Sequence, residues 1–162
     1  MAHYLVVANQ TLGRGLLDET VVARAHEGAA IHVTVPATPL NPDEPRSGDT
    51  AESVAQLRLN ETLRRLEEAG VHATGNVGAA DPLDAIREQL QLAHYSGMII
   101  STLPRTISRW LHLDLPHKAV REFRLPVEWV ESDDSSTVHI AVPNTSQPKV
   151  SNQDKIPPLR TY

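Results

Sequence analysis

Apolar and polar residues follow one another in blocks along the chain, and the blocks predict strands and helices in turn. Short apolar runs rich in β-branched residues are typical of buried strands. They occupy residues 3–8, 30–38, 71–78, 97–102 and 125–130. The segments between them carry apolar residues every three or four positions, as amphipathic helices do. These helical patterns cover residues 16–25, 51–69, 82–93 and 115–123.

Signals at the ends of these segments agree with the pattern. Asp81 and Pro82 together predict a helix start, because the carboxylate caps the first amides and proline is tolerated at the first helical position. Gly28 and Gly70 follow helical segments, where glycine commonly ends a helix. Residues 36–50 contain four prolines among turn-forming residues and are therefore predicted to form a loop.

The apolar positions of a predicted helix define the face that we expect to pack on the sheet. For the second helix these positions are Val54, Leu57, Leu63 and Leu66. For the third helix they are Leu83, Ile86, Leu90 and Ala93.

Five strands that alternate with helices, and that are apolar almost throughout, indicate a parallel sheet covered on both faces. We therefore expect a doubly wound, three-layer α/β/α fold with strand order 3-2-1-4-5, since right-handed crossovers favour that arrangement. Residues 1–131 are predicted to form this domain. Residues 132–162 are predicted to be a C-terminal extension, with a possible extra strand at 137–142 and then a polar tail.

Composition narrows the classes of function. A chain of 162 residues that is 40% hydrophobic suits one domain. Its net charge of −5 offers no basic surface to a polyanion, so no nucleic acid partner is expected. The absence of cysteine excludes disulfides and a thiolate nucleophile. Because no apolar run approaches 18 residues and no secretion signal is recognised, we expect a cytoplasmic protein without membrane contact.

Ligands of such sheets bind beyond the carboxyl ends of the strands, where the strand order reverses. Here this place lies after the first and fourth predicted strands. The candidate ligand contacts are Asn9, Thr11, Ser101, Thr102, Arg105 and Arg109. The two guanidinium groups are suited to a phosphate, although arginines in a loop are also commonly solvated or paired with carboxylates.

The order of elements, together with the segment GAADPLDAI and the run from MIIST to LPVEWV, resembles the universal stress protein family over roughly residues 3–130. Members of that family that bind ATP carry a Gly-x2-Gly-x9-Gly-Ser/Thr motif after the fourth strand and an aspartate at the end of the first. The spacing fits this chain, but the residues differ. Ser101, Pro104, Asp114 and Leu115 stand at the four motif positions, and Asn9 stands at the aspartate position.

These replacements remove the features that hold phosphates. Pro104 has no N–H to donate, and Ser101 tolerates fewer backbone angles than glycine. Asp114 is expected to cap the following helix with its own carboxylate and to repel an anion, while Leu115 lacks a hydroxyl. We therefore expect ATP to bind weakly or not at all.

Two functions stay open at this point. The resemblance implies a regulatory or interaction module, whereas the same fold also supports nucleotide-binding proteins and enzymes, in which Arg105 and Arg109 would replace the missing phosphate contacts. No catalytic motif is recognised, so no catalytic residue is assigned. The residues nearest to a metal-ligand group are His112, Asp114 and His117. No metal site is assigned, because Asp114 is better explained as a helix cap.

The resemblance further implies a homodimer through the sheet edge near Val127–Val130. Glu128 complicates this pairing, because its two copies would face each other across the interface. We therefore expect either a shifted register or an edge covered by residues 137–142, on the same subunit or swapped to the partner. In the second case three side chains would turn inward, those of Val138, Ile140 and Val142.

Overall fold

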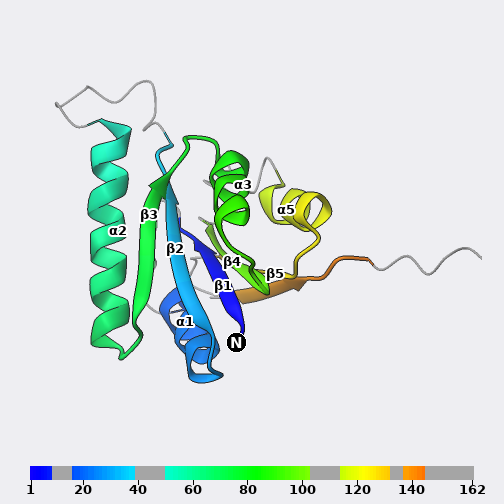
Figure 1. Cartoon of the computed structure of the whole chain (residues 1–162), viewed down its shortest axis with the longest axis horizontal. Coiled ribbons are helices and arrows are strands. Elements are labelled where there is room, and N and C mark those ends of the chain that lie inside the picture. Colours follow the sequence, from blue (N-terminus) through cyan, green and yellow to red (C-terminus); the bar gives the residue numbers. More distant parts are fainter. Residues whose placement is uncertain (9–15, 39–49, 103–113, 132–136, 145–162) are drawn as a thin grey trace, which may run out of the picture.

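A six-stranded sheet in the order β3-β2-β1-β4-β5-β6 runs through the computed structural model (Figure 1). The structure describes residues 1–8, 16–38, 50–102, 114–131 and 137–144. Five strands are parallel, namely β1 (His3–Val7), β2 (Ala30–Pro36), β3 (Ala73–Gly78), β4 (Gly97–Thr102) and β5 (Val127–Glu131). The predicted fold class and the predicted order of these strands are confirmed. A further strand, β6 (Thr137–Ala141), pairs antiparallel with β5.

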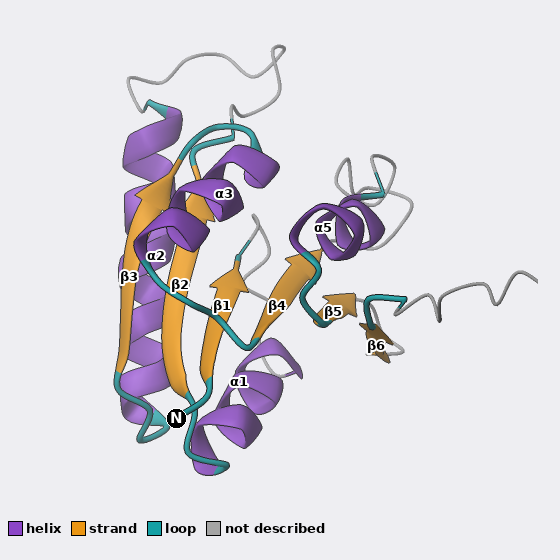
Figure 2. Cartoon of the chain, turned by 45° about the vertical axis from the view of Figure 1, so that its right-hand side comes forward, coloured by secondary structure: helices purple, strands orange, loops and turns teal. Residues whose placement is uncertain are grey.

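Helices pack on both faces of the sheet (Figure 2). One face carries α1 (Leu16–His26) and α2 (Ala51–Glu68), and we call it the α1/α2 face. The other carries α3 (Pro82–Leu92) and α5 (Leu115–Phe123), and we call it the α3/α5 face.

Strand side chains alternate between these two faces. Val6 packs in the cluster of the α1/α2 face, whereas its neighbours Leu5 and Val7 pack in the cluster of the α3/α5 face, and all three are fully buried. Both faces of the central strands are therefore covered, which explains why these strands are apolar almost throughout.

The helix ends follow the local signals. Asp81 caps α3, because its Oδ1 accepts from the backbone N–H of Leu83 at 2.8 Å and of Asp84 at 3.3 Å. Gly28 and Gly70 have φ angles of 90° and 80°, which glycine adopts without the steric cost of a Cβ. Asp81, Gly28 and Gly70 thus act as the sequence predicts.

The buried side of α2 agrees with the predicted one except at Leu57, since Leu66 is buried and Val54 and Leu63 are half-buried. Leu57 is 66% exposed, although the apolar pattern places it on the sheet-facing side. The residues of α2 that are buried are Ala55, Leu59, Thr62 and Leu66. Leu59 packs closely on the sheet, since a Cβ added to Gly75 of β3 would lie 2.6 Å from Leu59 Cδ1. The absence of a side chain at Gly75 leaves room for Leu59 on the sheet, whereas Leu57 faces solvent.

The outer strand β6 covers the edge of β5 within the same chain, and the orientation of its side chains corrects a prediction. Val138, Ile140 and Val142 are 38%, 64% and 66% exposed rather than turned inward. The register sets the side of the two residues that belong to β6, because Val138 lies opposite Val130 and Ile140 opposite Glu128, both of which belong to the α1/α2 face. Val142 lies just beyond β6. The alternate residues, His139 and Ala141, turn toward the α3/α5 face and are half-buried.

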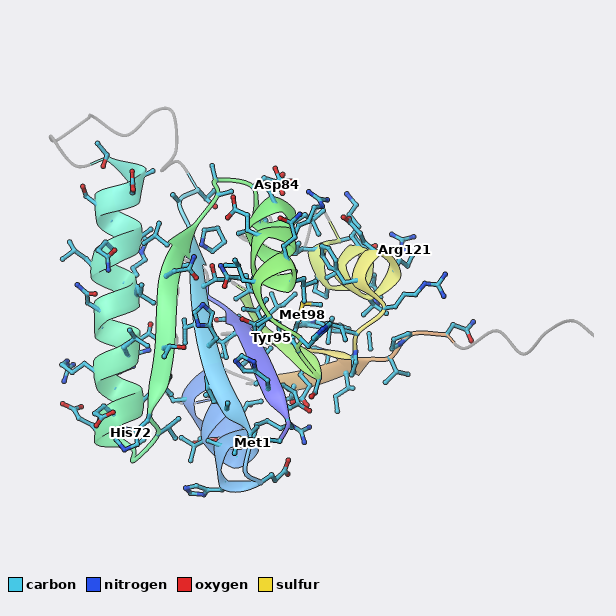
Figure 3. All side chains as sticks on the ribbon, viewed as in Figure 1. Met1, His72, Asp84, Tyr95, Met98 and Arg121 are labelled. Atoms are coloured by element: carbon cyan, nitrogen blue, oxygen red, sulfur yellow. The ribbon has the colours of Figure 1, made fainter. Side chains whose placement is uncertain are left out.

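Tyr95 lies with Met98 in the cluster of the α3/α5 face (Figure 3). Burial raises the pKa of the Tyr95 phenol above its ordinary value, because the phenolate is poorly solvated there. The unfolded tyrosine has a pKa of about 10, and the folded-state pKa of Tyr95 lies above it. The neutral, buried phenol therefore contributes its full stabilisation below a pH of about 10. It is lost as the pH rises through the folded-state pKa.

We therefore expect the free energy of unfolding to fall above a pH of about 10, and to fall less steeply in Tyr95→Phe, which has no phenol at this site. Absorbance at 295 nm during an alkaline titration measures the ionisation, and urea unfolding at each pH measures the stability. Equal slopes in the two proteins would contradict the assignment to Tyr95.

Candidate functional site

The carboxyl ends of β1 and β4 form the candidate site, since these parallel strands are neighbours and end at the same edge of the sheet. Val7 and Ile100 are the last residues of the two strands to pair with each other. Ala8 continues the line of β1 and donates its backbone N–H to the carbonyl of Thr34 at 3.1 Å. The backbone at this edge is therefore held in place by hydrogen bonds to the neighbouring strands.

Four of the predicted contact residues lie outside the described part of the chain. They are Asn9, Thr11, Arg105 and Arg109. Pro104 and His112 lie outside it as well. The contacts proposed for these residues stay predictions.

Ser101 and Thr102, the other two predicted contacts, are the last two residues of β4. Their backbones pair in register with Val130 and Glu131 of β5. Ser101 is fully buried and follows the alternation of Ile99 onto the α1/α2 face. Ser101 is thus a strand residue of the core at the position where the resemblance expects a glycine.

Asp114 stands at the N-terminus of α5 as predicted, but it does not cap the helix with its side chain. Its φ and ψ are 55° and 40°, in the left-handed region, and its carboxylate makes no hydrogen bond to the helix amides. Instead Oδ1 lies 2.6 Å from Nδ1 of His117, and Oδ2 lies 3.6 Å from a guanidinium nitrogen of Arg121. The predicted capping by Asp114 is therefore wrong, because His117 and Arg121 engage the carboxylate one and two turns along the helix.

Leu115 begins α5 at the position where the resemblance expects serine or threonine. Its side chain is buried in the cluster of the α3/α5 face, together with Ile86 of α3 and Ile100 of β4. Sequence reasoning noted the missing hydroxyl but not the burial. Leu115 anchors the start of α5 through the core.

Sequence reasoning missed an aromatic group around Trp129 on the same face. His139 of β6 stacks on the indole, with ring centroids 5.0 Å apart and planes at 15°. His117 of α5 meets it edge-on at 5.2 Å. The group ties α5, β5 and β6 together. The signal in the sequence was the alternation that turns Trp129 and His139 to one face, but only the β5–β6 register places them side by side.

Sequence reasoning also missed the partner of Glu128. A guanidinium nitrogen of Arg24, on α1, donates to Oε1 of Glu128, whose side chain is only 9% exposed. A second nitrogen of Arg24 donates to Glu27 at 2.8 Å, and the guanidinium carbon lies 5.5 Å from the ring centroid of Tyr4. The hydrogen bonds to Glu27 and then Glu128 raise the pKa of Arg24, so the guanidinium stays charged. The charge of Glu128 is thus compensated within its own subunit.

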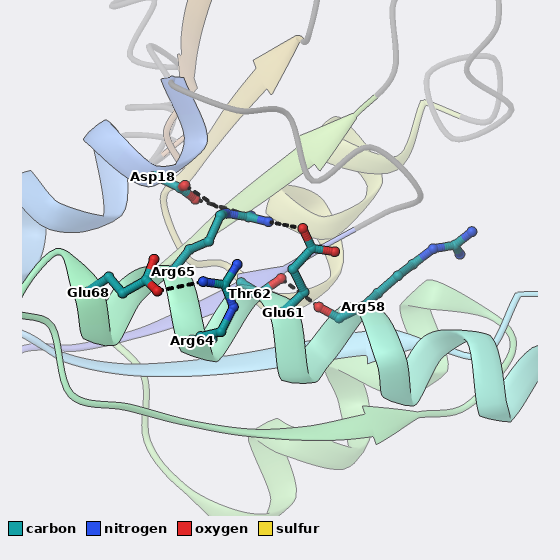
Figure 4. A network of polar contacts seen from close by, with 7 residues as sticks. All are labelled: Asp18, Arg58, Glu61, Thr62, Arg64, Arg65 and Glu68. Atoms are coloured by element: carbon teal, nitrogen blue, oxygen red, sulfur yellow. Dashed lines mark hydrogen bonds and ion pairs between the residues drawn. The ribbon is translucent and has the colours of Figure 1, made fainter.

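A second polar network joins α1 to α2 (Figure 4). Nε of Arg65 donates to Asp18 at 3.0 Å, and another nitrogen of Arg65 lies 3.5 Å from Glu61. Within α2, one turn before Arg65, the Thr62 hydroxyl donates to the carbonyl of Arg58 at 2.8 Å. This network positions the first turn of α1 against α2 and has a structural role.

Within the described ranges, no three or more histidine or acidic side chains gather closely enough to hold a metal ion. None of the helices described is both long enough and apolar enough to cross a membrane.

Comparison with known proteins identifies a related fold. No protein-family model matches the chain, and no curated protein sequence matches it. Among solved structures, the crystal structure of a universal stress protein in complex with cAMP is similar, with a TM-score of 0.55 and 17% identity. The match covers 82% of this chain and 100% of that one. A likeness at this identity shows the fold, which is that of a universal stress protein-like α/β domain.

Proposed function

We propose that this chain is a regulatory or interaction module of the universal stress protein type, which binds ATP weakly or not at all and acts through its surface and as a homodimer. The burial of Leu115 carries the proposal. A hydrocarbon side chain that packs into the core offers no hydroxyl to a phosphate at the start of α5.

The charge at the start of α5 acts in the same direction. The Asp114 carboxylate is half-exposed there, and an anion at this place meets a like charge. At 4 Å the repulsion between two unit charges is about 1 kcal/mol in water and about 4 kcal/mol at an effective dielectric constant of 20. Arg121 offsets part of it, because its guanidinium lies 3.6 Å from the carboxylate.

Titration calorimetry tests the proposal with ATP at physiological magnesium. We expect no measurable binding, or a Kd far above the micromolar range. A low micromolar Kd would show that the proposal is wrong. A parallel titration with cAMP is included, because the similar solved structure contains that ligand.

Asp114→Gly is the matched variant for this titration. Glycine suits the φ of 55° at this position, and the substitution removes the carboxylate while leaving the buried Leu115 in place. If the carboxylate contributes to the weak binding, Asp114→Gly binds ATP more tightly than the natural chain does. Leu115→Ser is a poorer test, because emptying a buried leucine site costs about 2–5 kcal/mol of stability.

A second candidate function is a nucleotide-binding protein or enzyme on this fold, with Arg105 and Arg109 as phosphate contacts. One observation favours it. The first amides of α5 receive no hydrogen bond from the Asp114 side chain, and a helix N-terminus attracts anions. If ATP binds tightly, Arg105→Ala and Arg109→Ala should each weaken it, which would support this second function.

A further inference from the structure

The outer side of α5 carries cations at a regular spacing. Lys118 and Arg121 are three residues apart and therefore lie on the same side of the helix, and Arg124 follows at the same interval as the C-cap residue. These residues are exposed, and Arg121 lies on the outer side of α5 (Figure 3). We call Lys118, Arg121 and Arg124 the α5 cation strip. At a rise of about 1.5 Å per residue, the strip is about 9 Å long.

Neighbouring carboxylates leave most of this positive charge uncompensated. Glu122 stands four residues after Lys118, but it pairs with Arg87 of α3. Asp114 lies 3.6 Å from Arg121 and offsets part of that charge. For Lys118 and Arg124, the described part of the chain offers no ion pair. The strip therefore has a net positive charge.

The other cations that the structure describes are arranged differently. Arg58 has no carboxylate partner there, but it is half-buried on α2. The arginines that lie against carboxylates are Arg24, Arg64, Arg65 and Arg87. Among the described residues, exposed positive charge without a close carboxylate is thus gathered on α5, in a chain whose net charge is −5. The helix dipole favours cations near the end of α5, but it leaves their charged groups exposed to a partner.

We infer that the α5 cation strip binds an acidic segment of a protein partner, a short stretch with several aspartates or glutamates. This inference rests on the proposed function, for which it names the class of partner. Carboxylates at alternate positions of an extended peptide are about 7 Å apart, so two of them fit along a strip of about 9 Å. Hydrogen bonds from guanidinium groups to carboxylates then add to the attraction between the charges.

A short acidic segment fits this surface better than a long polyanion does. Duplex DNA carries one negative charge about every 1.7 Å along its axis and extends far beyond a strip of about 9 Å. The excess negative charge of the chain would repel the rest of the duplex. An acidic peptide segment, in contrast, can end where the strip ends.

Fluorescence anisotropy of a fluorescein-labelled hexaglutamate peptide tests the inference on the full chain. We expect saturable binding at low ionic strength. Added salt should weaken it, because exposed charges are screened beyond about 8 Å at 0.15 M salt. A general effect of net charge would act in the opposite direction, since a chain of net charge −5 repels hexaglutamate. No binding at low ionic strength would overturn the inference.

Arg121→Glu and Arg64→Glu form a matched pair of variants. Each replaces a positive charge by a negative one, and the two arginine side chains are 70% and 61% exposed, but Arg64 lies on α2. We expect Lys118→Glu/Arg121→Glu to raise the peptide Kd by about tenfold or more and Arg121→Glu alone to raise it less, because each reversal replaces an attraction by a repulsion. Arg64→Glu should leave the Kd unchanged, and circular dichroism melts check that the variants are folded. Equal weakening by Arg64→Glu and Arg121→Glu would overturn the inference.

A short DNA duplex at the same ionic strength separates the two classes of anionic partner. If the duplex binds more tightly than hexaglutamate and Arg121→Glu abolishes that binding, the strip serves a nucleic acid and the inference is wrong. The calorimetric titration with ATP is independent of these measurements. Tight binding of ATP would overturn the proposed function without removing peptide binding to the strip, whereas failure of hexaglutamate to bind would leave the ATP result as it is.

Discussion

Replacing Arg24 by methionine is expected to lower the free energy of unfolding by about 2–4 kcal/mol, because it leaves the Glu128 carboxylate buried without its charged partner. The Glu128 side chain is 9% exposed and that of Arg24 is 29% exposed, so the carboxylate is the more buried partner. Removing one partner of a fully buried pair costs about 3–5 kcal/mol, and the partial exposure of Arg24 places our expectation slightly below that range. Urea unfolding followed by circular dichroism measures the change.

Arg64→Met is the matched control for this prediction. Arg64 also lies on a helix and pairs with a glutamate, Glu68, but the two side chains are 61% and 63% exposed. Exposed pairs contribute about 0–1 kcal/mol. If Arg24→Met lowers the free energy of unfolding no more than Arg64→Met does, the buried pair stabilises the fold no more than the exposed pair, and the prediction is wrong. Arg24→Met/Glu128→Leu should regain part of the loss, since no unpaired charge is then left inside.

Gly78→Ala is expected to lower the free energy of unfolding by about 1–3 kcal/mol, because α3 packs directly on this residue. A Cβ at Gly78 would lie 2.7 Å from the Cβ of Ala85 and 2.9 Å from Oγ1 of Thr34. Both neighbours are fully buried, and the Ala85 Cβ has no torsion by which it could move aside. α3 must therefore shift away from β3. Thermal and urea unfolding measure the loss.

Two further variants separate crowding from backbone effects. Ala85→Gly removes the closest atom, so Gly78→Ala should cost less in that background than in the natural chain. Gly70→Ala meets no atom within 4 Å, and its φ of 80° makes its cost one of backbone strain alone. Equal effects of Gly78→Ala with and without Ala85→Gly would contradict the crowding argument.

The order and type of the elements were determined by the sequence itself. Buried parallel strands need apolar side chains on both faces, and the helices beside them need one apolar side. Both patterns can therefore be recognised in the order of residues along the chain. Helix ends are local as well. The Asp81 cap and the glycine φ angles at Gly28 and Gly70 involve residues close in sequence, and all three were predicted correctly. The strand order followed because crossover handedness leaves few alternatives.

The tertiary structure alone decided contacts between distant segments. Leu59 rather than Leu57 packs on the sheet, over Gly75 of β3, a close approach that periodicity within one helix does not encode. The pairing of Glu128 with Arg24 depends on how α1 crosses β5.

At the candidate site, the tertiary structure also decided the surroundings of Asp114 and Leu115. A capping residue type at a helix start predicts a cap, but the left-handed backbone and the donors of His117 and Arg121 direct the Asp114 carboxylate elsewhere. The burial of Leu115 follows from packing against α3 and β4. The apolar residues of β6 face outward because the register with β5 sets their side. A one-residue slip would reverse it, and no local preference of the strand distinguishes the two registers.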